Sequence, residues 1–100
     1  MRTVKVEYKV RPDYVETNKQ NIKNVMKELR GLGDVGVQYS SHLKEDGQSF
    51  VHIVMQRDEA AAKVLGSLDS FKTFQSQLKG GVEIAPKAEE LSLVEKSFDL

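Results

Sequence analysis

Two histidines and one glutamate are the residues of this chain best suited to acid–base chemistry. His42 and His52 are the only histidines, and Glu7 lies in an alternating segment near the start of the chain. Imidazole changes its protonation near neutral pH, so histidine is the side chain most often used as a general base. We predict His52 as a catalytic base and Glu7 as the carboxylate that orients its ring and raises its basicity.

Two other interpretations of these residues remain open. A histidine hydrogen-bonded inside a polar cavity is structural, and that is the more common role for such a residue. Two histidines and a carboxylate also have the composition of a metal site, but their spacing matches no metal-binding motif, and we expect no metal. The chain contains no cysteine, which excludes disulfides, thiolate nucleophiles and cysteine-ligated metals.

Length and charge narrow the classes of partner. The 100 residues suit one domain, and the 15 basic and 15 acidic residues balance to a net charge of zero. Phosphate binding needs a basic excess, so we expect no nucleic-acid partner. The alternating, charged N-terminus does not resemble a signal peptide, and no apolar run approaches the ~20 residues of a membrane span. We therefore expect a soluble cytoplasmic protein with no membrane partner.

The spacing of apolar residues predicts an alternation of strands and helices. Apolar residues alternate in the predicted strands and recur every three or four residues in the predicted helices. The predicted order is a strand at 3–10, a helix at 13–30, strands at 35–43 and 49–56, a helix in two pieces at 58–78, a loop at 82–88, and a last strand marked by Leu91, Leu93 and Phe98. This β-α-β-β-α-β order predicts an α+β, ferredoxin-like fold, with both helices on one face of a four-stranded antiparallel sheet.

The turn between the two middle strands decides which way their side chains face. If Asp46-Gly47 is a two-residue turn, Ser41 faces His52; if Glu45-Asp46 is a type I turn followed by a left-handed Gly47, the loop has three residues and Ser40 faces His52. A slip of one residue moves every side chain to the other face. We favour the three-residue loop because it separates apolar from polar residues more cleanly.

That register predicts the composition of both faces of the sheet. The helix-covered face would carry Val4, Val6, Tyr8, Val37, Tyr39, Val51, Ile53 and Met55. The open face would carry His52 and Glu7, with a cavity lined by Lys5, Gln38, Ser40, His42, Phe50 and Val54. Lys5 and Lys9 share that face with Glu7, either as ion-pair partners or as a cationic lip for an acidic substrate.

The aromatic residues are most simply assigned to the core. Tyr8, Tyr39, Phe71 and Phe74 fit this role, although Tyr14 and Tyr39 could also place hydroxyls in a pocket between helix and sheet.

The chain resembles the dimeric α+β barrel superfamily, in particular its antibiotic-biosynthesis-monooxygenase-like branch. The resemblance covers nearly the whole chain. It is carried by the order of elements and by Ser67-Leu68-Asp69-Ser70-Phe71-Lys72-Thr73-Phe74, then Pro86, then the segment Leu91-Ser92-Leu93-Val94-Glu95. It implies a homodimer in which two sheets face each other, with residues 89–100 exchanged between subunits.

The resemblance also implies candidate activities. The superfamily includes cofactor-independent oxygenases and heme-degrading monooxygenases, several of which use a tryptophan with an asparagine and, for heme, a histidine on the second helix. This chain has no tryptophan, and its second helix offers Gln75 and Gln77 instead of histidine. We therefore expect no heme and no other cofactor. The resemblance implies a cofactor-independent monooxygenase-like enzyme acting on a small, partly apolar substrate; the alternative is a non-catalytic dimer that binds a small molecule or serves stress physiology.

Overall fold

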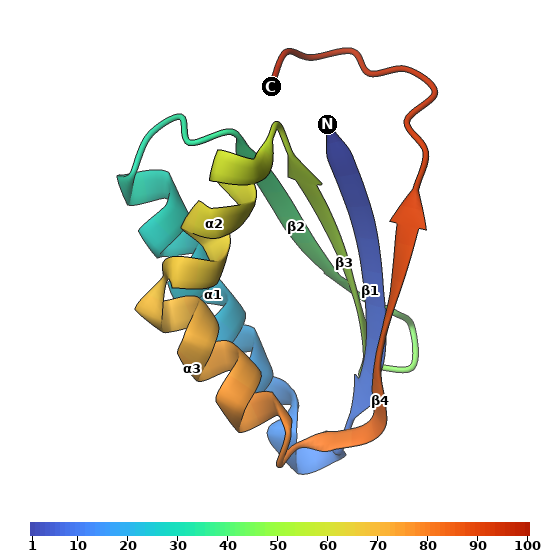
Figure 1. Ribbon diagram of the computed structural model, residues 1–100. Helices are drawn as coiled ribbons and strands as arrows, with labels where there is room; N and C mark the ends of the chain where they lie inside the picture. Colours follow the sequence, from blue (N-terminus) through green and yellow to red (C-terminus); the bar gives the residue numbers. More distant parts are fainter.

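A computed structural model describes residues 1–100 and shows a β-sheet with helices on one face (Figure 1). The strands are arranged β2-β3-β1-β4, and every neighbouring pair is antiparallel. The predicted α+β, ferredoxin-like fold class is therefore confirmed. In chain order the elements are β1 (Arg2–Val10), a 3₁₀ turn (Pro12–Tyr14), α1 (Val15–Gly31), β2 (Val37–Leu43), β3 (Ser49–Gln56), α2 (Glu59–Ser67), α3 (Asp69–Leu78) and β4 (Val82–Leu91).

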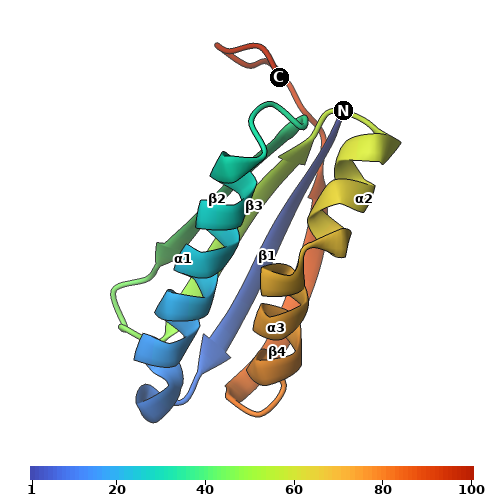
Figure 2. The ribbon, with the colours of Figure 1, turned by 90° about the vertical axis from the view of Figure 1, so that its left-hand side faces the viewer.

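The helices form one layer over the sheet, with α1 beside the α2–α3 pair (Figure 2). The second predicted helix is in two pieces, as expected, because Leu68 takes an extended conformation between them. Asp58 begins α2 by accepting a hydrogen bond from the backbone N–H of Ala61 at 2.9 Å. None of these helices is long and apolar enough to cross a membrane.

The core lies between the helices and the sheet. It is built by apolar side chains that point from the sheet toward the helices and by the apolar faces of the helices that meet them. Its buried members are Tyr8, Val10, Val15, Val25, Phe50, Val54, Leu65, Leu68, Phe74 and Leu78.

The prediction for the C-terminal part of the chain was wrong. The last strand begins at Val82, includes the segment expected to be a loop, and ends at Leu91. Pro86 is tolerated because β4 is an edge strand, so the missing N–H is not needed for pairing on its free side. The β1–β4 register also shifts by one residue between Glu7 and Lys9, and this bulge accommodates Ala85 and Pro86.

The favoured register of the middle hairpin was also wrong. Gly47 is left-handed, with φ 71°, and its N–H bonds to the Lys44 carbonyl, as the type I turn requires. The strands resume only at Ser49, whose carbonyl accepts from the Lys44 N–H at 2.8 Å, so the loop has one residue more than predicted. The Asp46 carboxylate accounts for this, because it accepts hydrogen bonds from the backbone N–H groups of Gln48 and Ser49.

This one-residue difference reverses the faces of β3. Ser41 pairs with His52, and Val6 pairs with His52 on the other side, so His52 points toward the helices. Phe50 and Val54 are buried with it, whereas His42 is exposed on the open face and its Nε2 lies 3.0 Å from Ser40 Oγ. Three residues predicted for the core lie on the open face instead: Val51, Ile53 and Met55.

Candidate functional site

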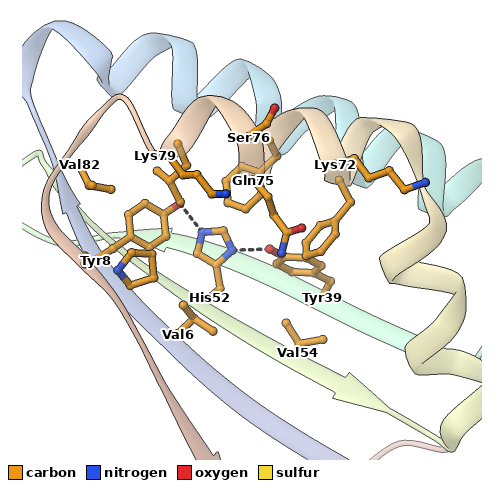
Figure 3. A pocket seen from close by; sticks show the side chains of 15 residues that line it. Val6, Tyr8, Tyr39, His52, Val54, Lys72, Gln75, Ser76, Lys79 and Val82 are labelled. Atoms are coloured by element: carbon orange, nitrogen blue, oxygen red, sulfur yellow. Dashed lines mark hydrogen bonds between the residues drawn. The ribbon is translucent and has the colours of Figure 1, made fainter.

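A cavity of about 760 Å³ lies between α3, the sheet and the first half of β4 (Figure 3). Its volume falls in the range of about 300–1,000 Å³ that is common for small-molecule sites. Apolar side chains form most of its wall: Val6, Val54, Phe71, Phe74, Leu78, Val82, Ala85 and Pro86. The polar members of the wall are Tyr8, Tyr39, His52, Lys72, Gln75, Ser76 and Lys79. A cavity with a mainly apolar wall and a limited set of polar groups is typical of a small-molecule site.

His52 is the centre of a buried hydrogen-bond chain at this cavity. Its Nε2 lies 2.7 Å from Tyr8 Oη, and its Nδ1 lies 2.5 Å from Tyr39 Oη (Figure 3). Asn18, on α1, extends the chain by donating from Nδ2 to Tyr8 Oη at 2.8 Å. Tyrosines from the two neighbouring strands, β1 and β2, therefore hold the imidazole in place, and Asn18 on α1 in turn holds Tyr8.

The tautomer of His52 sets the order of donors and acceptors along this hydrogen-bond chain. In the tautomer that carries its proton on Nδ1, His52 accepts at Nε2 from the Tyr8 hydroxyl, which itself accepts from Asn18. Ser41 Oγ lies 3.3 Å from the same nitrogen. A neutral imidazole that accepts at Nε2 carries its proton on Nδ1, which then donates to Tyr39 Oη. The hydroxyl proton of Tyr39 has no protein acceptor left, and Tyr39 lines the cavity. The chain therefore ends in a hydroxyl donor that a ligand can use.

Burial keeps every member of the chain uncharged at neutral pH. His52 is 2% exposed, and loss of hydration lowers the pKa of its imidazole to about 4, with a smaller contribution from the charge of His42. Burial also raises the pKa values of Tyr8 and Tyr39 well above the usual range for a phenol. Tyr39 is therefore a hydroxyl donor, and His52 is a weaker base than an exposed histidine.

The predicted Glu7–His52 pair does not form. Glu7 and His52 point to opposite faces, because Val6 rather than Glu7 pairs with His52 across β1 and β3. The Glu7 carboxylate instead lies 3.1 Å from Lys44 Nζ and 3.7 Å from Lys5 Nζ. The ion-pair interpretation of Lys5 is thus confirmed. His42, His52 and Glu7 do not come together as a metal site, and no other group of three potential metal ligands does so.

Only one of the residues predicted to line the cavity does so. Val54 is part of the wall, and Phe50 is buried behind it, stacked on Tyr8 with ring centroids 5.6 Å apart. The other four, Lys5, Gln38, Ser40 and His42, belong to the open face of the sheet or its edge. The errors for Lys5, Gln38, Ser40 and His42 follow from placing the cavity on the wrong face of the sheet.

Several site residues could have been found by a closer reading of the pattern. Tyr39 does place its hydroxyl at a pocket between helix and sheet, as one interpretation predicted, but Tyr14 does not line this cavity. Asn18 occupies a position in the apolar spacing of α1 and is fully buried, so a buried polar partner could have been expected there. The apolar spacing gave no signal that Lys79 would line this cavity.

Comparison with solved structures identifies proteins that share this fold. No sequence-family profile and no curated protein matches the chain. Among solved structures, an antibiotic biosynthesis monooxygenase matches 95% of this chain and 100% of its own, with 14% identity and a TM-score of 0.80. The chain has the antibiotic biosynthesis monooxygenase fold. A Pseudomonas aeruginosa protein (20% identity, TM-score 0.78, 94% of each chain) and a Mycobacterium tuberculosis protein (14%, 0.80, 97% of this chain and 98% of that one) share this fold.

Proposed function

We propose that this protein is a cofactor-independent monooxygenase-like enzyme that acts on a small hydroxylated aromatic molecule. The observation that carries the proposal is the Asn18–Tyr8–His52–Tyr39 chain, which ends in a hydroxyl donor within an apolar cavity. The antibiotic biosynthesis monooxygenase fold supports the reaction class by analogy only.

Without a cofactor, the substrate itself must reduce dioxygen. One oxygen atom enters the substrate and the other leaves as water, with four electrons supplied as a CH₂ carbon becomes a carbonyl. The substrate begins this transfer as a phenolate conjugated to that carbon, having released its proton to solvent because the cavity holds no free base. Tyr39 would stabilise the phenolate by donating a hydrogen bond from its hydroxyl to the charged oxygen, as donors do in an oxyanion hole.

His52 serves this reaction through Tyr39 in our proposal. Both of its ring nitrogens are hydrogen-bonded, and its pKa of about 4 makes it a poor proton acceptor at neutral pH. We therefore assign His52 as a positioning residue that fixes the Tyr39 hydroxyl, instead of the general base expected from the sequence.

Replacing Tyr39 with phenylalanine should reduce kcat by roughly 10²–10³-fold, the usual cost of removing one oxyanion donor. The measurement is dioxygen uptake with 1,8-dihydroxyanthrone, corrected for its rate in buffer. Tyr14→Phe is the matched control, because the Tyr14 hydroxyl lies outside the cavity and has no hydrogen-bond partner. Equal rates for Tyr39→Phe and the wild-type protein would contradict the role of Tyr39.

A non-catalytic, ligand-binding protein is the second candidate. It is favoured by the absence of a free base, because neither nitrogen of His52 is available and no carboxylate lines the cavity. Saturable binding of 1,8-dihydroxyanthrone with no uptake of dioxygen above the buffer rate would select this candidate over the enzyme.

We also propose that a second copy of the chain covers the open face of the sheet. Val51, Ile53 and Met55 form an apolar strip there, and Ile84 on β4 is 61% exposed. Sedimentation equilibrium should give twice the mass of the chain, and Ile53→Lys should shift the protein toward monomer, because it buries a charge in the interface. Thr17→Lys, on the exposed side of α1, should remain dimeric. A wild-type monomer at 100 µM would refute the dimer.

A further inference from the structure

The ionic side chains of the cavity are all positive. Its fifteen lining residues include Lys72 and Lys79 but no aspartate or glutamate, and neither lysine takes part in an ion pair. His52 adds no charge at neutral pH, because burial holds its imidazole neutral. The cavity is therefore electropositive in a chain whose overall net charge is zero.

The two lysines are placed differently with respect to the hydrogen-bond chain. Figure 3 shows Lys79 extending from the end of α3 toward the side of the cavity where Tyr8 and His52 lie. Lys72 points away from them along α3, whereas Gln75 points down toward Tyr39. Gln75 and Lys79 are four residues apart, so they share one side of the helix. Lys79 is thus the cation best placed to meet a ligand.

Apolar side chains form most of the rest of the cavity wall. Val6, Val54, Phe74 and Leu78 surround the space, and the Tyr39 hydroxyl and the Lys79 side chain both reach it near His52 (Figure 3). A ligand that satisfies all three features carries a hydroxyl, an apolar body and a negative charge.

We propose that the cavity selects hydroxylated aromatic carboxylates, with Lys79 binding the carboxylate. The inference rests on the proposed function, because Tyr39 is taken to bind the hydroxyl in both. A lysine ammonium is a compact charge on a flexible stem, so it attracts a carboxylate without demanding a fixed planar geometry. An aromatic phenol without the carboxylate would leave the ammonium to water and lose this attraction.

Two naphthalene probes test the selection directly. 6-Hydroxy-2-naphthoate and 2-naphthol share a ring system and a hydroxyl and differ in the carboxylate. The chain has no tryptophan, so probe fluorescence can be followed with little protein background. At low salt, the naphthoate should bind roughly tenfold more tightly, as expected for one charge-assisted hydrogen bond. Added salt should reduce this preference, because Lys79 is exposed and its ammonium is screened by ions.

Lys79→Gln should abolish the preference and leave the affinity for 2-naphthol unchanged within twofold. Lys23→Gln, on the exposed side of α1, removes the same charge at a distance and should retain the preference. Equal affinities of the wild-type protein for the two probes would overturn the inference. So would a preference that survives in Lys79→Gln, or a failure of both probes to bind at millimolar concentration.

The same measurements separate this inference from the proposed function. Binding is measured without dioxygen, so it does not depend on turnover. If the Lys79-dependent preference is present but 1,8-dihydroxyanthrone consumes no dioxygen, the selection stands and the enzyme proposal fails. If 1,8-dihydroxyanthrone is oxidised in a Tyr39-dependent way but the preference is absent, the enzyme proposal stands and the selection is wrong.

Discussion

Replacing Tyr8 with phenylalanine should lower the free energy of unfolding by roughly 2–4 kcal/mol. The change keeps the ring that stacks on Phe50 but removes the hydroxyl that joins Asn18 to His52. Asn18 is 0% exposed and His52 is 2% exposed, so water cannot replace the lost partner. A buried polar group left unpaired costs about 1–3 kcal/mol. The substitution leaves Asn18 Nδ2 without a partner and leaves His52 Nε2 only its longer contact, 3.3 Å to Ser41 Oγ. Urea denaturation monitored by circular dichroism gives the value.

A second substitution tests the reason for this loss. Adding Asn18→Leu to Tyr8→Phe removes one of the unpaired groups, so the double variant should be more stable than Tyr8→Phe alone by about 1 kcal/mol. Two substitutions at distant core sites with no shared partners would only add their losses. A single variant within 0.5 kcal/mol of the wild-type protein would show that the Tyr8 hydroxyl does not hold the chain together.

Acid should destabilise the protein through His52. Its pKa is about 4 in the folded protein and near 6.5, the ordinary value for histidine, in the unfolded chain. Between these values the unfolded chain binds a proton that the folded protein does not, so the free energy of unfolding decreases as the pH falls from 6.5 to 4. The contribution that is fully present above pH 6.5 and lost by pH 4 is about 3 kcal/mol.

The two histidines provide a matched pair for this measurement. His52→Phe should flatten the pH dependence between 6.5 and 4, whatever its effect on stability at neutral pH. His42→Gln should retain most of it, because His42 is exposed and contributes only a minor charge effect at His52. The His52 imidazole should also remain neutral at pH 5.5 by NMR. An imidazole that titrates near pH 6.5 would contradict the buried hydrogen-bond chain.

The hairpin after β2 explains why the candidate site was predicted on the wrong face. Alternation correctly grouped Phe50, His52 and Val54 on one side of β3, but it did not say which side the helices would cover. The favoured register was chosen to separate apolar from polar residues. The folded protein instead places a histidine in the core, which costs little because Tyr8 and Tyr39 satisfy both of its ring nitrogens.

The sequence by itself determined the order of the elements, the fold class and the residue types available for chemistry, because periodicity and turn residues act over a few positions. Only the tertiary structure decided that His52 and Glu7 lie on opposite faces of the sheet and that Tyr8, Tyr39 and Asn18 meet at His52. The physical reason is a local feature of the hairpin loop between β2 and β3. The Asp46 carboxylate binds the N–H groups of Gln48 and Ser49, adds one residue to the loop, and so reverses the direction of every side chain that pairs across it.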